Sequence, residues 1–162
     1  MTRNTGRAGR DGTRPGVRAH VTRARLEWGA GVSVVLNEET RSLLEGRNFA
    51  TVATLDPDGG PQTSLVWVGL HGETVVLSTT AGRRKARNLG RDPRVSLTIY
   101  DADNPYRSVD IRGTAELVDD PDKALPRELS HKYRGIDPPP EPEEVHRLIV
   151  RITPDKVTRF PR

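Results

Sequence analysis

Short runs of alternating apolar and polar residues fill most of the chain after residue 48. A period of two is typical of a β-strand with one buried face, and it is clearest around Val109, Ile111 and Ala115. The runs that predict strands are 49–56, 61–70, 73–80, 94–101, 108–119 and 147–160, the last as one strand or two. The first three runs are separated by "PDGG" and "HG", which are turn signals of hairpin type. About six strands joined in this way predict a mainly β, antiparallel closed barrel or sandwich rather than a parallel βαβ sheet.

Helical patterns interrupt the strands in three places. The predicted helices cover residues 37–46, 81–92 and 120–135. Asn37 can cap the first helix, and Thr79 or Thr80 can cap the second. Pro126 should interrupt or shorten the third, because proline lacks the amide hydrogen that an inner turn needs. The proline-rich stretch 136–144 predicts a rigid connection that ends in a brief helical turn.

Residues 1–31 differ in composition from the rest of the chain. This segment holds seven Arg against only Asp11 and Glu27, a net charge of +5, whereas the remainder is close to neutral. Its richness in Arg and Gly without apolar periodicity predicts disorder. Two alternative interpretations are a transit peptide and a start codon assigned too early, with the true start near Val32. A single folded domain is expected over 32–162.

The composition also limits the chemistry. The chain has no cysteine, no apolar run of membrane-spanning length and no signal-peptide core, so we expect a cytoplasmic protein without membrane attachment. Because the basic charge is confined to the tail and aromatic residues make up 4% of the chain, nucleic-acid binding is not expected. The four histidines are isolated, and no set of nucleophile, base and orienting group is present, so we expect neither a metal site nor catalytic side chains. Any catalysis should then belong to a bound cofactor.

The stretch "TTAGRRKARNLGRD" poses a problem for the predicted second helix. Arg83, Arg84 and Lys85 stand at its start, with Arg87 and Arg91 behind them. Cations in a first turn oppose the helix dipole by roughly 0.3–1 kcal/mol each. A docked anion would reverse that penalty, and the unpaired amides of a first turn also favour one. The stretch therefore predicts a phosphate site, the alternative being a solvated surface helix.

Two motifs together resemble a known family. The chain reads "A-T-x-x-x-D-G-x-P-Q" over 53–62 and "R-x-K-x-R-N-L-x-x-D-P-R" over 83–94. From about Leu36 to Phe160 it resembles the pyridoxamine 5'-phosphate oxidase-like split-barrel family, in particular its deazaflavin-dependent branch. The resemblance implies a six-stranded antiparallel split barrel with a few short helices, and a homodimer with two cofactor sites at the interface.

The resemblance also implies which residues contact the cofactor. Its phosphate would lie on Arg83 and Lys85, with Arg84 and Arg87 nearby, and its ribityl chain along Ser78, Thr79 and Thr80. The ring system would lie beside the segment Gln62, Thr63, Ser64, Leu65 and Val66. Tyr106, Arg107 and Ser108 would approach the neighbouring subunit's cofactor. Trp67 is open to two interpretations, a ring contact or a core or dimer-contact residue.

The resemblance implies an oxidoreductase in which reduced coenzyme F420 passes a hydride to a conjugated small molecule. The first alternative is the same barrel using FMN as an oxidase or reductase. The second is a flavin or deazaflavin binding protein without turnover. The ending "VTRFPR" lacks the Arg/His pattern by which true pyridoxamine-phosphate oxidases hold their substrate, which argues against vitamin B6.

Overall fold

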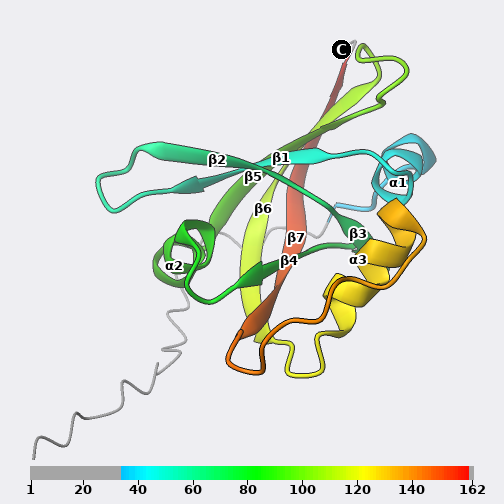
Figure 1. The fold of residues 1–162 in the computed structure, drawn as a ribbon. Coiled ribbons are helices and arrows are strands. Elements are labelled where there is room, and N and C mark those ends of the chain that lie inside the picture. Colours follow the sequence, from blue (N-terminus) through cyan, green and yellow to red (C-terminus); the bar gives the residue numbers. More distant parts are fainter. Residues whose placement is uncertain (1–33, 161–162) are drawn as a thin grey trace, which may run out of the picture.

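The computed structural model describes residues 34–160, in which seven antiparallel strands form one sheet with three short helices around it (Figure 1). In chain order the elements are α1 (Glu38–Glu45), β1 (Ala50–Leu55), β2 (Pro61–Val66), β3 (Gly69–His71), β4 (Thr74–Thr80), α2 (Arg84–Arg91), β5 (Arg94–Tyr100), β6 (Ser108–Asp119), α3 (Ala124–Arg134) and β7 (Arg147–Phe160). The predictions made for residues 1–31 lie outside the described residues. No helix of the described part is long and apolar enough to cross a bilayer.

The strand order is β2-β1-β5-β6-β7-β4-β3. The two longest strands, β6 and β7, pair along almost their whole length at the centre of the sheet. The edge strands β2 and β3 are neighbours in sequence, linked only by Trp67 and Val68, yet no ladder joins them among the described strands. The sheet therefore curls into a barrel that is split between β2 and the β3–β4 pair, as Figure 1 shows.

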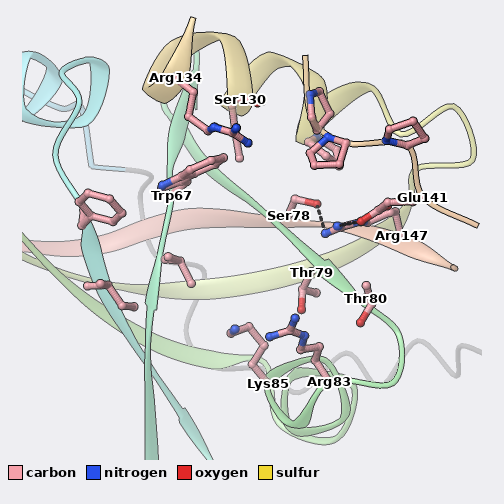
Figure 2. A pocket seen from close by; sticks show the side chains of 18 residues that line it. Trp67, Ser78, Thr79, Thr80, Arg83, Lys85, Ser130, Arg134, Glu141 and Arg147 are labelled. Atoms are coloured by element: carbon pink, nitrogen blue, oxygen red, sulfur yellow. Dashed lines mark hydrogen bonds and ion pairs between the residues drawn. The ribbon is translucent and has the colours of Figure 1, made fainter. Parts of the chain in front are cut away.

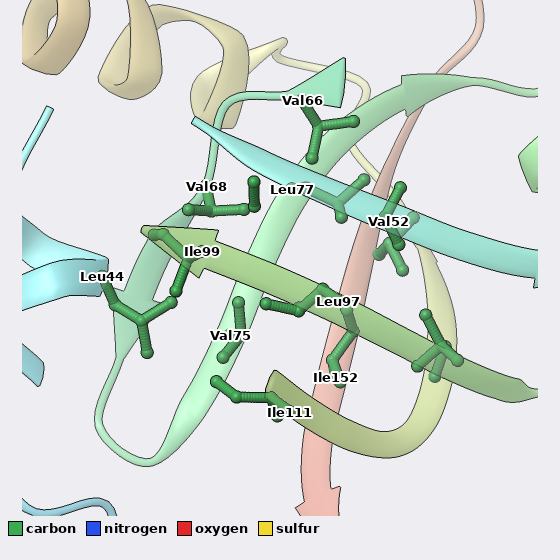
Figure 3. Close-up of a cluster of buried hydrophobic side chains, with 14 of the residues drawn as sticks. Leu44, Val52, Val66, Val68, Val75, Leu77, Leu97, Ile99, Ile111 and Ile152 are labelled. Atoms are coloured by element: carbon green, nitrogen blue, oxygen red, sulfur yellow. The ribbon is translucent and has the colours of Figure 1, made fainter. Parts of the chain in front are cut away.

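Alternation along the strands places one row of side chains inside the barrel. β5 buries every second residue, and β6 does so over its first nine. The aliphatic side chains of Leu97, Ile99, Ile111, Val150 and Ile152 are almost completely buried there (Figure 3). Burial of about 1.5–3 kcal/mol per aliphatic side chain makes this cluster the main stabilising feature of the fold.

The ladder between β6 and β7 contains one irregularity. The register shifts between Arg112 and Gly113. A Cβ atom added at Gly113 would lie 2.3 Å from the carbonyl oxygen of Thr153, so no side chain fits at this position without a backbone movement. The shift lies close to Ile152, where β7 stops pairing with β4, so it increases strand twist near the point at which the ribbon changes partners.

The predicted elements are confirmed with three differences. The predicted run 61–70 divides into β2 and β3, so there are seven strands, whereas 147–160 is one continuous strand. Thr79 and Thr80 do not cap α2, because both still belong to β4; the cap position is Arg83, without a side-chain hydrogen bond. Pro126 does not interrupt α3, because the helix begins at Ala124 and an amide N–H in its first turn would have no carbonyl acceptor within the helix.

Candidate cofactor site

A cavity of about 470 Å³ opens where the barrel is split (Figure 2). The end of β2, the end of β4, the start of α2, one face of α3 and the proline-rich segment before β7 surround it. Its lining residues include Leu65, Val66, Ser78, Thr79, Thr80, Arg83 and Lys85 from the predicted set. They also include Phe49, Trp67, Pro126, Leu129, Ser130, Arg134, Pro138, Pro139, Pro140, Glu141 and Arg147, which were not predicted.

The start of α2 forms the cationic end of this cavity. Lys85 is only 9% exposed, and its ammonium group has neither a hydrogen bond nor an ion pair with any described residue. Burial, helped by the neighbouring Arg83 guanidinium, lowers the pKa of Lys85 below its usual range. Arg83 is exposed and its guanidinium is also without a described partner. A partly desolvated ammonium group without an anion is unfavourable, so this end of the cavity is complementary to an anion.

Two buried hydroxyl groups lack hydrogen-bond partners, one on the cavity lining and one on β2 outside it. They are the Oγ1 of Thr79 and the Oγ of Ser64, and the only other such atom in the described part is the Oγ1 of Thr40 under α1. Figure 2 shows the Thr79 side chain directed toward Lys85 and Arg83. An unmade hydrogen bond of a buried polar group costs about 1–3 kcal/mol, and native proteins seldom leave one. Two cations and an unsatisfied hydroxyl at a helix N-terminus fit a ligand phosphate with its ester oxygens.

A third cation at the cavity is already neutralised. The Arg147 guanidinium donates to both carboxylate oxygens of Glu141, with Nε 2.9 Å from Oε2, and its Nη1 lies 3.4 Å from the Ser78 hydroxyl. The hydrogen bonds from Arg147 hold the pKa of Glu141 below its ordinary value, and those to Glu141 raise that of Arg147. Arg147 can therefore bind an anion in the cavity only if its ion pair with Glu141 opens.

The opposite wall is aromatic and apolar. Trp67 stacks on Tyr133 of α3 with ring centroids 5.1 Å apart and the planes 5° from parallel. The Tyr133 hydroxyl donates to the Asn48 carbonyl oxygen at 2.6 Å and accepts from the Val68 amide at 3.1 Å. Tyr133 therefore anchors the link between β2 and β3, and with it Trp67, to α3. A planar ring fits beside such a stack.

The other predicted site residues lie outside the cavity lining. Arg84 binds Asp56, and Arg87 donates to the carbonyl oxygen of Gly82. Arg107 pairs with Asp101 at 3.0 Å and with Glu39 at 3.7 Å. Gln62, Thr63, Ser64, Arg84, Arg87, Tyr106, Arg107 and Ser108 are the residues predicted to contact the cofactor that do not line this cavity.

The segment that carries Tyr106, Arg107 and Ser108 lies at the far end of β5 and β6 from α2 and α3 (Figure 1). Tyr106 is 73% exposed, and its ring stacks on that of Phe160 at 6.2 Å. Within one chain this segment is remote from the cavity. The prediction that it meets the cofactor of a second subunit stays a prediction.

The unpredicted lining residues share one property, which is that tertiary pairing brings them to the cavity. Arg147 reaches Ser78, 69 residues earlier in the chain, because β7 pairs with β4. The proline-rich segment and α3 both belong to the long connection between β6 and β7. Trp67 was recognised only as ambiguous. The sequence signal that could have assigned Trp67 to the site is its position directly after a predicted strand whose residues line the cavity.

Comparison with known proteins agrees with this fold. The sequence profile described as pyridoxamine 5'-phosphate oxidase matches residues 36–160, nearly the whole described chain. The chain belongs to this family. The cavity with its cationic end thus lies in a family member whose fold and motifs were both expected from the sequence.

Individual relatives differ in how much of the chain they match. A pyridoxine/pyridoxamine 5'-phosphate oxidase of Kineococcus radiotolerans is 37% identical over 71 residues, which are 44% of this chain and 31% of that protein. The structure is similar to that of an F420 reductase with a TM-score of 0.70 and 34% identity, covering 76% of this chain and 98% of that one. It is also similar to a conserved hypothetical protein of Mycobacterium tuberculosis with a TM-score of 0.64 and 29% identity, covering 80% and 87%.

Proposed function

We propose that this family member is an F420-dependent oxidoreductase that transfers a hydride between reduced deazaflavin and a conjugated small molecule. The observation that carries the proposal is the largely buried side chain of Lys85, whose ammonium group lacks an anionic partner among the described residues and lies in the cavity with the unsatisfied hydroxyl of Thr79. The similarity to an F420 reductase over 98% of that chain supports a deazaflavin at this site.

The chain's residues divide the binding task by chemistry. Lys85 and Arg83 hold the phosphate, and Ser78, Thr79 and Thr80 offer hydroxyl groups to the ribityl chain. β2 is an edge strand that pairs only with β1, so some backbone groups of residues 62–66 are free of the ladder and can bind the polar edge of a ring system. Trp67 and Leu65 supply the apolar surface beside it.

The bound deazaflavin or flavin supplies the hydride chemistry. The protein orients the reacting partners and restricts water, and the rigid wall of Pro138, Pro139 and Pro140 contributes to both tasks. No side chain is assigned as an obligate acid or base, and the described residues hold no cluster of three or more metal-ligating side chains. The proposed protein acts in the cytoplasm as a homodimer with the cofactor at the interface.

Two alternatives use the same cavity. FMN has the same ribityl phosphate, so the cationic end of the cavity accepts it equally well, and the family name of the Kineococcus relative favours an oxidase of this kind. A binding protein without turnover would need the same contacts.

Cofactor titration separates these functions. Purified full-length protein is titrated with coenzyme F420 and with FMN, followed by anaerobic turnover on enones and quinones. We expect tight binding of F420 and oxidation of its reduced form by at least one acceptor. Tight FMN binding without F420 binding would overturn the cofactor assignment, and F420 binding without turnover on any acceptor would favour the non-catalytic alternative.

A further inference from the structure

A polar network joins α2 to the β1–β2 hairpin and lies outside the cofactor cavity. Asp56, directly after β1, accepts hydrogen bonds on Oδ1 from Arg84 Nε at 2.8 Å and from Asn88 Nδ2 at 2.9 Å. Its Oδ2 accepts from Arg84 Nη2 at 2.6 Å. The Asn88 amide also donates to the Thr54 hydroxyl at 3.0 Å, and Arg91 donates to the Leu55 carbonyl oxygen. The Asp56 carboxylate thus binds side chains from two successive turns of α2.

The network is buried where it meets the helix. Asn88 is 2% exposed and Thr54 is 1% exposed, and the Asp56 side chain is 13% exposed. The hydrogen bond from Asn88, together with Arg84, keeps the pKa of Asp56 below its usual value, so the carboxylate is charged at neutral pH. The bidentate pair between Arg84 and Asp56 is exposed on the arginine side, so orientation is fixed mainly by its planar geometry and by the buried amide of Asn88.

Helical geometry connects this network to the cationic end of the cavity. Asn88 follows Lys85 by three residues, so the two side chains lie on neighbouring parts of the same buried face. Arg84, in contrast, is turned by about 100° from Lys85 and lies on the side facing β1. A rotation of α2 that frees Asn88 from Asp56 therefore also moves Lys85 away from the cavity.

We propose that Asp56, acting through Arg84 and Asn88, is a positioning residue that sets the rotation of α2 and thereby directs Lys85 into the phosphate end of the cavity. The proposal rests on the proposed function only in naming the ligand as a cofactor phosphate. It divides four of the five basic residues of 83–91 by task. Arg83 and Lys85 face the ligand, whereas Arg84 and Arg91 fasten the helix.

The sign of one substitution separates positioning from simple electrostatics. Asp56→Asn removes a negative charge near the cationic end and leaves Arg84 without its counter-ion. Electrostatics alone therefore predicts tighter binding of an anion and a lower pKa for Lys85. If Asp56 positions Lys85, Asp56→Asn should instead weaken binding of the anion and raise the pKa of Lys85, because a displaced Lys85 is more hydrated and no longer contacts the phosphate.

The affinity experiment uses full-length wild type, Asp56→Asn and Arg84→Gln, each with and without Lys85→Met. Asp58→Asn is the matched control, because Asp58 lies in the same turn and, among the described residues, accepts only from the Gly60 amide. We expect Asp56→Asn to weaken binding of F420 or FMN by about three- to tenfold, and to have no effect in the Lys85→Met background. The exposed Arg84 side chain should tolerate Arg84→Gln, and we expect the same pattern. An equal loss in both backgrounds would overturn the proposal and indicate direct contact with the phosphate.

A second measurement needs no cofactor. The chain has four lysines, so reductive methylation with ¹³C-formaldehyde gives a small set of NMR signals whose pH titrations are separate. Lys85→Arg assigns the signal of Lys85. We expect its midpoint in Asp56→Asn to rise above that in the wild type, and an unchanged or lowered midpoint would overturn the proposal. If the wild type binds neither cofactor, the proposed function fails while this measurement still decides the role of Asp56.

Discussion

Replacing Lys85 by methionine tests the cofactor site most directly. Lys85 is 9% exposed as a residue and its ammonium group has no anionic partner among the described residues, so the apo-protein bears the cost of its partial desolvation without compensation. Methionine keeps the length of the side chain and removes the charge. We therefore expect the free energy of unfolding of the apo-protein to stay level or to rise, a gain of 1 kcal/mol raising Tm by about 2–4 °C in a domain of this size.

Cofactor binding should change in the opposite direction. A hydrogen bond to a charged group is worth about 1.5–3 kcal/mol, which corresponds to a loss of affinity of roughly ten- to a hundredfold. The stabilisation by saturating cofactor should then fall by about 1.4–2.7 kcal/mol. Turnover at saturating cofactor should be largely retained, because the lost contact is the same in ground and transition states.

The assay is calorimetric titration together with thermal unfolding, with and without F420 or FMN. Lys156→Met, which removes an exposed lysine of β7, is the control and should change neither quantity. Unfolding of the apo-protein by Lys85→Met, or an unchanged cofactor affinity, would refute the reasoning from burial and missing counter-charge.

Three further predictions concern neighbouring groups. Glu141→Gln should tighten cofactor binding severalfold in calorimetric titration, because it releases the Arg147 guanidinium, whereas Glu144→Gln in the same segment should not; equal affinities would show that Arg147 never reaches the ligand. Tyr133→Phe should lower the free energy of urea unfolding by about 1–3 kcal/mol, because the Val68 amide and the Asn48 carbonyl lose their partner; a change below 0.5 kcal/mol, roughly the level of a neutral surface substitution, would contradict this. Burial lowers the pKa of Lys132 to about 8, so the folded state binds fewer protons than the unfolded state between about pH 8 and 10.5, and the stability of the wild type should rise with pH there relative to Lys132→Met. Urea unfolding of both proteins at pH 7 and pH 9.5 measures this difference, and a constant difference would rule it out.

The strands were predictable because their signal is local. Residues 108–119 alternate so regularly that the predicted bounds are those of β6. The break inside 61–70 was not predictable, because Trp67 and Val68 continue the apolar run. The structure shows that the Tyr133 hydroxyl on α3 accepts a hydrogen bond from the Val68 amide in this link, 65 residues earlier in the chain.

The candidate site divides in the same way. The stretch "GRRKAR" predicted an anion site, and the structure adds that Lys85 is buried and without a partner. The sequence did not predict that Arg84 and Lys85, which are adjacent, would contact different parts of the structure. Their contacts depend on which face of α2 packs against the β1–β2 hairpin. Arg147, Glu141 and the proline wall reach the cavity through strand pairing and a long excursion, and composition carries no information on such register.

The split between β2 and the β3–β4 pair has a consequence for how this fold varies. The barrel is completed there by two residues of covalent chain rather than by a ladder of hydrogen bonds. Its circumference can therefore change at this seam without the loss of a hydrogen bond between β2 and β3, provided that the core side chains of Val66 and Val68 beside it stay packed. The cavity lies on the seam, so exchanging side chains such as Trp67, or lengthening the excursion that carries α3, resizes the ligand space at little cost in stability. A scaffold of this kind separates the evolution of ligand choice from the requirement to stay folded.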